Sequence, residues 1–508
     1  MVLCLHDMLF FVLLKKDASG RPFQHYSLYD CSLQNKLRTG CIMAKDNKEY
    51  DKLVSRDFHA KGRPGKIEVV PTKPYFNQRH LGLAYSPGVA EPCLDIMGHP
   101  ADVYKYTAKG NLVGVVTNGT AVLGLGDIGS LAAKPVMEGK SLLFKTFADI
   151  DAFDIEISTT HTDRFVSVVS NISNTFGAIN LEDIKAPDCF EIEERLQQLL
   201  DIPVMHDDQH GTAVVVAAAL VNALRVNGKD IEEIRVVING AGAEAIGCAR
   251  MFCLIGVTRE NIVMLDSKGV IKEERPVGKD GEEITWGRAA PERPVHPAKA
   301  EFATKRAVNS LLEALNGADV FVGFSKPDIL TVDMLESMAQ NPVVFALSNP
   351  NPEISYDLAM NARNDIIFGT GRSDYPNQIN NLLAFPYIFR GALDVRARKI
   401  NPEMKLAAVH AIADLALRPV PATVLSAYDV KRLDFGRRYL LPKPLDYRLM
   451  SDVSCAVAQA AVKTGVARLS VGEGEEALKY WEKYKISLQK RLDAIKGICY
   501  RCKRGVKL

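Results

Sequence analysis

The sequence has almost no excess of charge of either sign. Its 508 residues carry 63 lysines and arginines against 61 aspartates and glutamates, a formal net charge of +2. This balance offers neither a basic stripe for nucleic acid nor an acidic tail. The composition, 47% hydrophobic and 24% charged, is that of a globular protein long enough for two or three domains.

Long apolar runs are also missing. The run MLFFVLL at 8–14 and the run from Ala213 to Val221 are both shorter than the ~20 residues that a membrane-spanning helix needs. Lysines follow the first run instead of preceding it, unlike a signal peptide. We interpret residues 1–42 as a non-native or disordered extension ahead of a natural start at Met43.

The ten cysteines are not spaced as a disulfide framework, which favours a cytoplasmic location. The one close pair, Cys499 and Cys502, has no second pair to complete a zinc site. We interpret this pair as incidental.

Strand and helix patterns alternate from about residue 110 to 440, which predicts an α/β fold. A helix that is apolar almost all round is expected at 212–226, and the last forty residues resemble a surface helix. The strands are expected within 112–119, 141–147, 176–183, 202–208, 234–239, 261–269, 319–325, 342–350 and 365–371.

Gly240, Gly242 and Ala245 form a glycine motif between a strand and an unbroken helix. The next strand ends in Asp266, where a ribose-binding acid belongs. Backbone N–H groups at the start of such a helix cradle a pyrophosphate. This context predicts a dinucleotide site.

A second glycine cluster, Gly124, Gly126 and Gly129, follows an earlier strand. Here Pro135 stands where a phosphate-binding helix should continue. We therefore interpret this cluster as a tight active-site turn, with a second dinucleotide site as the alternative.

Acidic side chains end two successive strands, Glu182 with Asp183 and Asp207 with Asp208. Ligands of open α/β sheets bind beyond the carboxyl ends of the strands, so these groups should share one crevice. Converging carboxylates repel one another unless a cation lies between them, and oxygen ligands favour Mg²⁺ or Mn²⁺.

Two other interpretations of the acidic cluster stay open. His206 and His210 argue weakly for zinc, although no cysteine stands near them. Alternatively, Asp207 or Asp208 caps the following helix.

Six ordered strings stand out: LGLAYSPGVAEPC (81–93), KYTAKGNLVGVVTNGTAVLGLGDIG (105–129), KPVMEGK (134–140), NLEDIKAPDCFEIE (180–193), PVMHDDQHGTA (203–213) and GRSDYPNQINN (371–381). They resemble malic enzyme, most closely the bacterial NADP-dependent type. The resemblance runs from about 60 to 465. It implies divalent-metal-dependent oxidative decarboxylation of (S)-malate to pyruvate with NADP⁺ or NAD⁺, and decarboxylation of oxaloacetate. Relatives of this type often carry a C-terminal phosphotransacetylase-like domain, for which this chain has no room after about 470.

The resemblance implies Tyr85 as general acid and Lys140 as general base. Asp207 would then be the helix cap or a supporting neighbour of the metal site. In animal malic enzymes an arginine occupies the position of Ala121, so the substrate carboxylate must bind another group here. The implied metal ligands are Glu182, Asp183 and Asp208.

The resemblance also implies the cofactor and substrate residues. Asn349 and Asn380 match asparagines that hold the substrate and the nicotinamide. Asp266 suits a free 2′-hydroxyl, whereas Lys268 suits a 2′-phosphate, and the resemblance favours NADP⁺. The implied cofactor-binding residues are Gly240, Ala241, Gly242, Ala243, Glu244, Asp266, Lys268 and Asn349.

The expected organisation is an N-terminal substrate-binding α/β domain at 43–205 and a doubly wound Rossmann-type domain at 206–445. A helical segment with a basic tail would occupy 446–508. We expect a homo-oligomer that binds neither nucleic acid nor membrane. The competing hypotheses are a metal-free amino-acid dehydrogenase and a non-catalytic nucleotide-sensing protein.

Overall fold

The computed structural model describes residues 45–122, 124–273 and 296–505, and it divides the chain into two compact units, 1–65 and 66–508. The first unit contains α2 (Lys45–Ala60). The interpretation of residues 1–42 falls outside the described residues. The side chains of Cys499 and Cys502 are not described either.

The first sheet of the second unit has the strand order β2-β1-β3-β4, with every pair parallel. Its central strands are apolar and buried on both faces, as parallel strands require. The strands are β1 (Leu112–Thr117), β2 (Asp151–Glu156), β3 (Ala178–Leu181) and β4 (Val204–His206). Connecting helices are α6 (Ser130–Ala148), α7 (Thr162–Ile172) and α8 (Asp188–Leu199).

The strand predicted at 141–147 is wrong, because these residues lie in α6. Met137, Phe144 and Ala148 are buried at helical spacing along one face. The helix also runs through Pro135, which we expected to interrupt it. Pro135 is the sixth residue of α6, past the first turn whose N–H groups have no partner within the helix, so α6 continues although one backbone hydrogen bond is lost.

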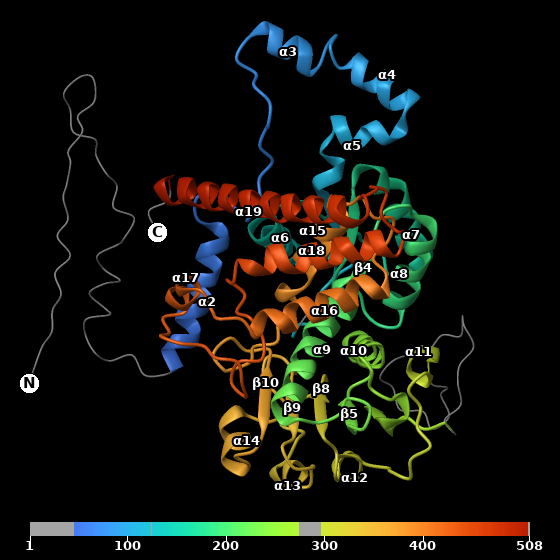
Figure 1. The fold of residues 1–508 in the computed structure, drawn as a ribbon, viewed down its shortest axis with the longest axis vertical. Helices are drawn as coiled ribbons and strands as arrows, with labels where there is room; N and C mark the ends of the chain where they lie inside the picture. Colours follow the sequence, from blue (N-terminus) through green and yellow to red (C-terminus); the bar gives the residue numbers. More distant parts are fainter. Residues whose placement is uncertain (1–44, 123, 274–295, 506–508) are drawn as a thin grey trace, which may run out of the picture. The chain divides into compact units, whose positions relative to one another are not determined.

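The second sheet has the order β10-β9-β8-β5-β6-β7 and is parallel except for β7. The chain winds from β5 to one edge and from β8 to the other, which confirms the Rossmann-type expectation (Figure 1). The strands are β5 (Val236–Asn239), β6 (Ile262–Asp266), β7 (Gly269–Val270), β8 (Val320–Gly323), β9 (Val343–Ala346) and β10 (Ile367–Thr370).

The apolar helix predicted at 212–226 is α9 (Asp207–Asn227), which begins five residues earlier than expected. It packs against α10 (Ala243–Leu254) and α16 (Pro402–Ala416). By length and composition α9 is the one helix of the described residues that could cross a membrane, but 72% of that stretch is buried inside the protein. The α9–α10 contact is so close that a Cβ on Gly247 would lie 2.2 Å from the Gln209 carbonyl oxygen.

The C-terminal helices pack onto the same core, and the predicted terminal helix is confirmed as α19 (Gly474–Gly505). Its Tyr484, Leu488 and Leu492 are buried. The other helices are α15 (Phe385–Asp394), α18 (Arg448–Lys463), α11 (Pro297–Ala300), α12 (Leu311–Leu315), α13 (Val332–Glu336), α14 (Tyr356–Ala362) and α17 (Ala422–Ala427). Ahead of β1 lie α3 (Gln78–Ala84), α4 (Ala90–Gly98) and α5 (Val103–Tyr106).

Candidate active site

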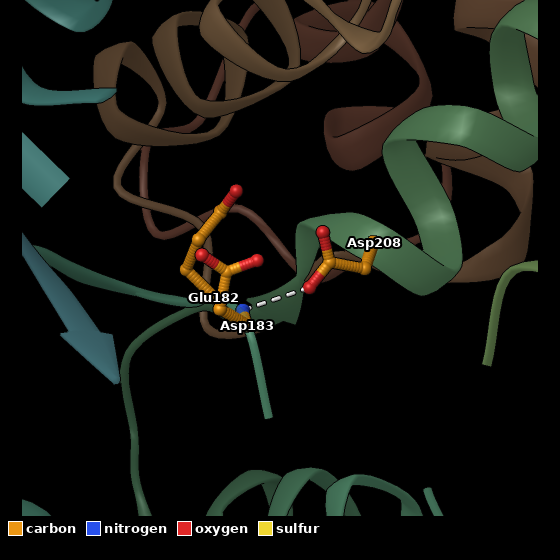
Figure 2. Close-up of side chains that lie close together, drawn as sticks. All are labelled: Glu182, Asp183 and Asp208. Atoms are coloured by element: carbon orange, nitrogen blue, oxygen red, sulfur yellow. Dashed lines mark hydrogen bonds between the residues drawn. The ribbon is translucent and has the colours of Figure 1, made fainter. Parts of the chain in front are cut away.

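Three carboxylates meet beyond the carboxyl ends of β3 and β4. Glu182 and Asp183 directly follow β3, and Asp208 is the second residue of α9, which follows β4 (Figure 2). Their ligand oxygens lie within 4.8 Å of one another. The Asp183 amide donates a 2.8 Å hydrogen bond to Asp208 Oδ2, with Asp183 in the left-handed region at φ 54°. The sequence-based prediction that these three meet agrees with this geometry.

The three carboxylates of the cluster carry more negative charge than the neighbouring cation, Lys140, can balance. Burial and the repulsion between these carboxylates raise the pKa of Asp183 to about 9. Burial likewise raises the pKa of Glu182 to about 7 and that of Asp208 to about 6, although Lys140 opposes both shifts. Asp183 Oδ2 is buried without a hydrogen-bond partner. A compact, oxygen-only set of this kind fits Mg²⁺ or Mn²⁺.

Lys140 lies on α6 beside these acids. Its Nζ is 2.8 Å from Glu182 Oε1 and 2.6 Å from Asp207 Oδ2, and 4.1 Å from the centre of the Phe385 ring. Burial opposes the ammonium charge, but the carboxylates of Asp207 and Glu182 outweigh it and hold the pKa of Lys140 above its usual value. The lysine is therefore fixed and charged in this arrangement.

Asp207 does not cap α9; it supports Lys140 instead. The residue at the N-cap is His206, and no side chain hydrogen-bonds there. Asp207 Oδ2 accepts from Lys140 Nζ and, at 2.7 Å, from Asn381 Nδ2. Gly211 makes room for this carboxylate, since a Cβ there would lie 1.8 Å from Asp207 Oδ1. Asn381 was missed from the sequence, although it adjoins the implied Asn380.

His206 borders the carboxylate cluster, with its Nε2 3.5 Å from Asp208 Oδ2, whereas His210 lies against Glu193 and Lys405. Burial lowers the pKa of His206 to about 4, so its ring is neutral, and the ring nitrogens have no hydrogen-bond partner. His210 Nε2 lies 3.0 Å from Glu193 Oε2, and His210 Nδ1 lies 3.0 Å from Lys405 Nζ. This arrangement favours the oxygen-only interpretation over zinc.

The first glycine cluster forms a tight turn at the start of α6. Gly124, Gly126 and Gly129 have φ of 74°, 75° and 77°, a region that favours glycine. Backbone hydrogen bonds between Val122 and Gly126 close the turn, and Gly129 is the N-cap of the helix that carries Lys140. The geometry agrees with the active-site-turn interpretation.

The second cluster joins β5 to α10 at the point where the strand order reverses. Gly240 has φ 122°, and a Cβ there would lie 2.7 Å from the Phe324 carbonyl oxygen beyond β8. Gly242 is the N-cap of α10, whose first N–H groups are therefore available to a pyrophosphate. Ala245 is fully buried.

The residues around this turn connect the cofactor crevice to the acidic cluster. Burial and the carboxylates of Asp208 and Asp207 raise the pKa of Glu244 to about 8. Asp266 ends β6, and its carboxylate accepts from the Lys268 amide at 2.9 Å and from Lys299 Nζ at 3.4 Å. Lys299 was not identified from the sequence.

The implied asparagines lie on loops that follow β9 and β10. Asn349 is exposed, and its Nδ2 donates to the Leu347 carbonyl at 3.3 Å. Asn380 Oδ1 accepts from the Leu382 amide. Glu353, also missed, is fully buried and accepts from the amides of Ser325 and Ser348, which ties the loops beyond β8 and β9 together.

Tyr85, the implied general acid, lies at the surface of the described chain. It ends α3 and is 80% exposed. Lys140, only 7% exposed, contacts Glu182, Asp207 and Phe385 instead.

Comparisons with known proteins agree with this geometry. Residues 64–197 match the model of the malic enzyme N-terminal domain, and residues 209–426 match the malic enzyme NAD binding domain. A malic enzyme structure from Pyrococcus horikoshii has a TM-score of 0.77 and 40% identity, covering 89% of this chain and 98% of that one.

Curated relatives are closer in sequence. The NADP-dependent malic enzymes of Halomonas elongata and Rhizobium meliloti are each 53% identical over 81% of this chain. The chain spans 94% of the Halomonas protein but about half, 52%, of the Rhizobium one. Identity at this level, together with the two domain matches, shows that the chain belongs to the malic enzyme family.

Proposed function

We propose that this chain oxidises (S)-malate to pyruvate and CO₂ with NADP⁺, uses Mg²⁺ or Mn²⁺, and also decarboxylates oxaloacetate. The observation that carries the proposal is the cluster of three carboxylates, two of them buried, in which Glu182 contacts Lys140, next to a glycine turn that would bind the dinucleotide. Family membership and the names of the relatives support the same reaction. Residues 43–205 would bind substrate, 206–445 would bind the cofactor, and 446–508 would complete the helical core.

Two bound groups would supply the chemistry that side chains lack. The proposed metal ligands are Glu182, Asp183 and Asp208. When bound, the divalent cation supplies a Lewis acid for the oxygens of malate, and NADP⁺ supplies the hydride acceptor.

Lys140 is the proposed base for the C2 hydroxyl proton of malate. Its ammonium must first lose a proton, and the two carboxylates that raise its pKa oppose that loss. Neutralising the negative charge of Asp207 and Glu182 would lower the pKa of Lys140. This favours the neutral amine, which is the form that can accept the hydroxyl proton. Asp207, held by Asn381, orients the amine.

Tyr85 is the proposed acid for the second half of the reaction. Decarboxylation leaves enolpyruvate, whose C3 takes up a proton to become the methyl group of pyruvate. A phenol hydroxyl can donate that proton if solvent restores it. The turn at Gly124, Gly126 and Gly129 would be an active-site turn, with Asn349 and Asn380 on the substrate and nicotinamide side.

The preference for NADP⁺ rests on lysines near Asp266. Lys299 Nζ lies 3.4 Å from the Asp266 carboxylate. Its positive charge offsets the negative charge of Asp266, so Asp266 repels a 2′-phosphate less than an unpaired carboxylate would. Lys268 and Lys299 supply positive charge for such a phosphate. The remaining contacts to the dinucleotide would come from Gly240, Ala241, Gly242, Ala243 and Glu244.

The proposed location is the cytoplasm, because the described cysteines carry free thiols, as is usual in a reducing compartment. These are Cys93, Cys189, Cys248, Cys253 and Cys455.

The test is malate-dependent reduction of NADP⁺ with and without EDTA. We expect turnover with Mn²⁺ or Mg²⁺ and none after chelation. Cation-independent reduction with an amino acid as substrate would favour a dehydrogenase without metal. Nucleotide binding without turnover of either substrate would favour a sensor protein.

A further inference from the structure

Asn180 is a polar side chain inside an otherwise apolar strand. The strand β3 consists of Ala178, Ile179, Asn180 and Leu181, and all four residues are buried. In the register of the sheet Asn180 lies opposite Val115 on β1 and Met205 on β4, which are both fully buried. Burying an amide among apolar neighbours costs free energy unless hydrogen bonds replace those it made to water. Packing alone therefore does not account for an asparagine at this position.

The amide of Asn180 is directed at one of the clustered carboxylates. Residues two apart along a strand place their side chains on the same face, and Glu182 follows Asn180 by two. Asn180 Nδ2 donates a 2.8 Å hydrogen bond to Glu182 Oε2. Asn180 Oδ1, in contrast, is buried without a hydrogen-bond partner among the described residues. The donor half of this amide is thus used for Glu182, and the acceptor half contributes nothing to the stability of the strand.

Both oxygens of the Glu182 carboxylate are held in the structure. Lys140 Nζ lies 2.8 Å from Oε1, and Asn180 donates to Oε2. The last torsion of a glutamate side chain is only weakly restricted by itself, so these two contacts fix the plane of the carboxylate. A ligand group that is already oriented binds its partner without the loss of rotational freedom that a mobile one incurs.

The two donors on Glu182 differ in what turnover asks of them. Lys140 is the proposed base, so its charge and its contacts have to change during the reaction. A carboxamide does not titrate, and Asn180 remains the same donor in every state of the site. Asp208 has a comparable fixed donor, because its Oδ2 accepts a hydrogen bond from the backbone amide of Asp183. Two of the three carboxylates in Figure 2 are therefore held by a neutral N–H group.

We propose that Asn180 is a positioning residue for the cation site, which holds Glu182 in its metal-binding orientation while Lys140 exchanges its proton. The inference rests on the assignment of Glu182 as a metal ligand in the proposed function. Removing a group that hydrogen-bonds to a ligand typically weakens metal binding by about 10- to 100-fold. Asn180 should accordingly determine the affinity for the cation and have little influence on the chemical step.

The test is isothermal titration calorimetry of Mn²⁺ with the metal-free variant Asn180→Leu, whose side chain has a similar shape but no donor. We expect the Kd for Mn²⁺ to rise by about 10- to 100-fold. The Mn²⁺ concentration that gives half of the maximal rate of malate turnover should rise in parallel. At saturating Mn²⁺ the kcat should stay within about threefold of wild type, because the ligands themselves remain.

Thermal unfolding separates this role from a purely structural one. Asn180→Leu removes the unpartnered Oδ1 together with the bond to Glu182, so the melting temperature of the metal-free protein should change little. Asn180→Ala also lacks the donor and carries the test if the leucine variant does not fold; the same weakening of Mn²⁺ binding is expected. A large loss of melting temperature with wild-type Mn²⁺ affinity would show that Asn180 serves only the fold, and would overturn the inference.

Asn239→Leu is the matched control. Asn239 is a buried asparagine at the end of β5, and its Nδ2 donates to Ser325 Oγ at 2.8 Å. Because Ser325 follows β8 in the other sheet, the Mn²⁺ affinity of this variant should be that of wild type. An equal weakening in Asn239→Leu would overturn the specific role of Asn180.

The remaining outcomes distinguish this inference from the proposed function. Wild-type Mn²⁺ affinity in both Asn180 variants overturns the positioning role and leaves the proposed metal ligands in place. Absence of Mn²⁺ binding in the wild-type protein removes the ligand assignment itself, and the inference falls with it.

Discussion

Two groups of carboxylates, one beyond β3 and the other at Glu193, meet the first turn of α9, and their pKa values are shifted in opposite directions. On one side Asp183 and Asp208 have pKa values raised to about 9 and about 6. On the other side the pKa of Glu193 is lowered to about 2. Burial raises the pKa in all three cases, so the neighbours decide the outcome.

The neighbours of Glu193 supply what the other group lacks. The Glu193 carboxylate accepts a 2.9 Å hydrogen bond from the His206 amide and also contacts Gln209 and His210. The positive charge of Lys405 further stabilises the ionised carboxylate. Its charge is balanced by the protein itself. The cluster beyond β3 has one lysine for several acids, and that imbalance is why we assign the cation to it and not to Glu193.

The largest effect is expected from Asp208→Ala. Malate-dependent NADP⁺ reduction should fall more than about 100-fold, because a hard-cation site loses a charged ligand. The fold should remain, since the raised pKa of Asp208 means that its charge is unfavourable without a cation. Initial rates across a Mn²⁺ titration provide the measurement.

Asp188→Ala is the control, because Asp188 opens α8 as an acidic first-turn residue outside the cluster. Normal turnover of Asp208→Ala at low Mn²⁺ would mean that the ligand set is wrong.

Lys140 and Lys405, which are both buried, test the contrast between the carboxylate cluster and the Glu193 site. Lys140→Ala should slow NADPH formation from malate by about 10²- to 10⁴-fold, with a smaller effect on oxaloacetate decarboxylation. Lys405→Ala removes the cation that contacts His210 and attracts Glu193 from farther away, and it should instead cost about 1.5–3 kcal/mol of stability with little change in kcat. Steady-state rates and denaturant unfolding of both variants separate the two roles. Equal losses of kcat would erase the distinction between the two groups.

The pH dependence of stability tests the balanced group. Because the pKa of Glu193 is lowered from 4.5 to about 2, its contribution is complete above pH 4.5 and is lost as pH falls towards 2. Glu193→Gln should therefore cost about 3 kcal/mol at pH 7. The difference in unfolding free energy from wild type should shrink below pH 4.5. A difference that stays constant with pH would show that the carboxylate charge is not what stabilises this site.

The smallest effect concerns the cofactor. Lys268→Ala should raise the KM for NADP⁺ by about tenfold and leave that for NAD⁺ unchanged, because only NADP⁺ carries the 2′-phosphate. Lys272→Ala, a lysine whose Nζ contacts Asn309, is the control. Parallel rises in KM for both cofactors would place Lys268 away from the ribose.

Much of the fold was predictable because its signals are local. Buried parallel strands appear as short apolar runs, and a glycine turn between strand and helix identifies the cofactor fold. The run at 141–147 was misassigned because seven residues of mixed apolar character do not distinguish a strand from a helix face. The position of α6 between β1 and β2 decides that question, and it follows from tertiary packing.

The site was predictable where its residues end neighbouring strands. Glu182, Asp183 and Asp208 fall into this class. Asn381 and Phe385 come from a distant part of the chain, and only the fold brings them to Asp207 and Lys140. Asn381 ends the GRSDYPNQINN string, but nothing local in the sequence indicates that it contacts Asp207.

The most direct test of the central claim is to measure Mn²⁺ binding to the purified protein by isothermal titration calorimetry, without substrate or cofactor. The account predicts one site per chain in wild type and in Glu193→Gln, and its loss in Asp208→Ala. Equal binding by wild type and Asp208→Ala, or loss of binding in Glu193→Gln alone, would contradict it.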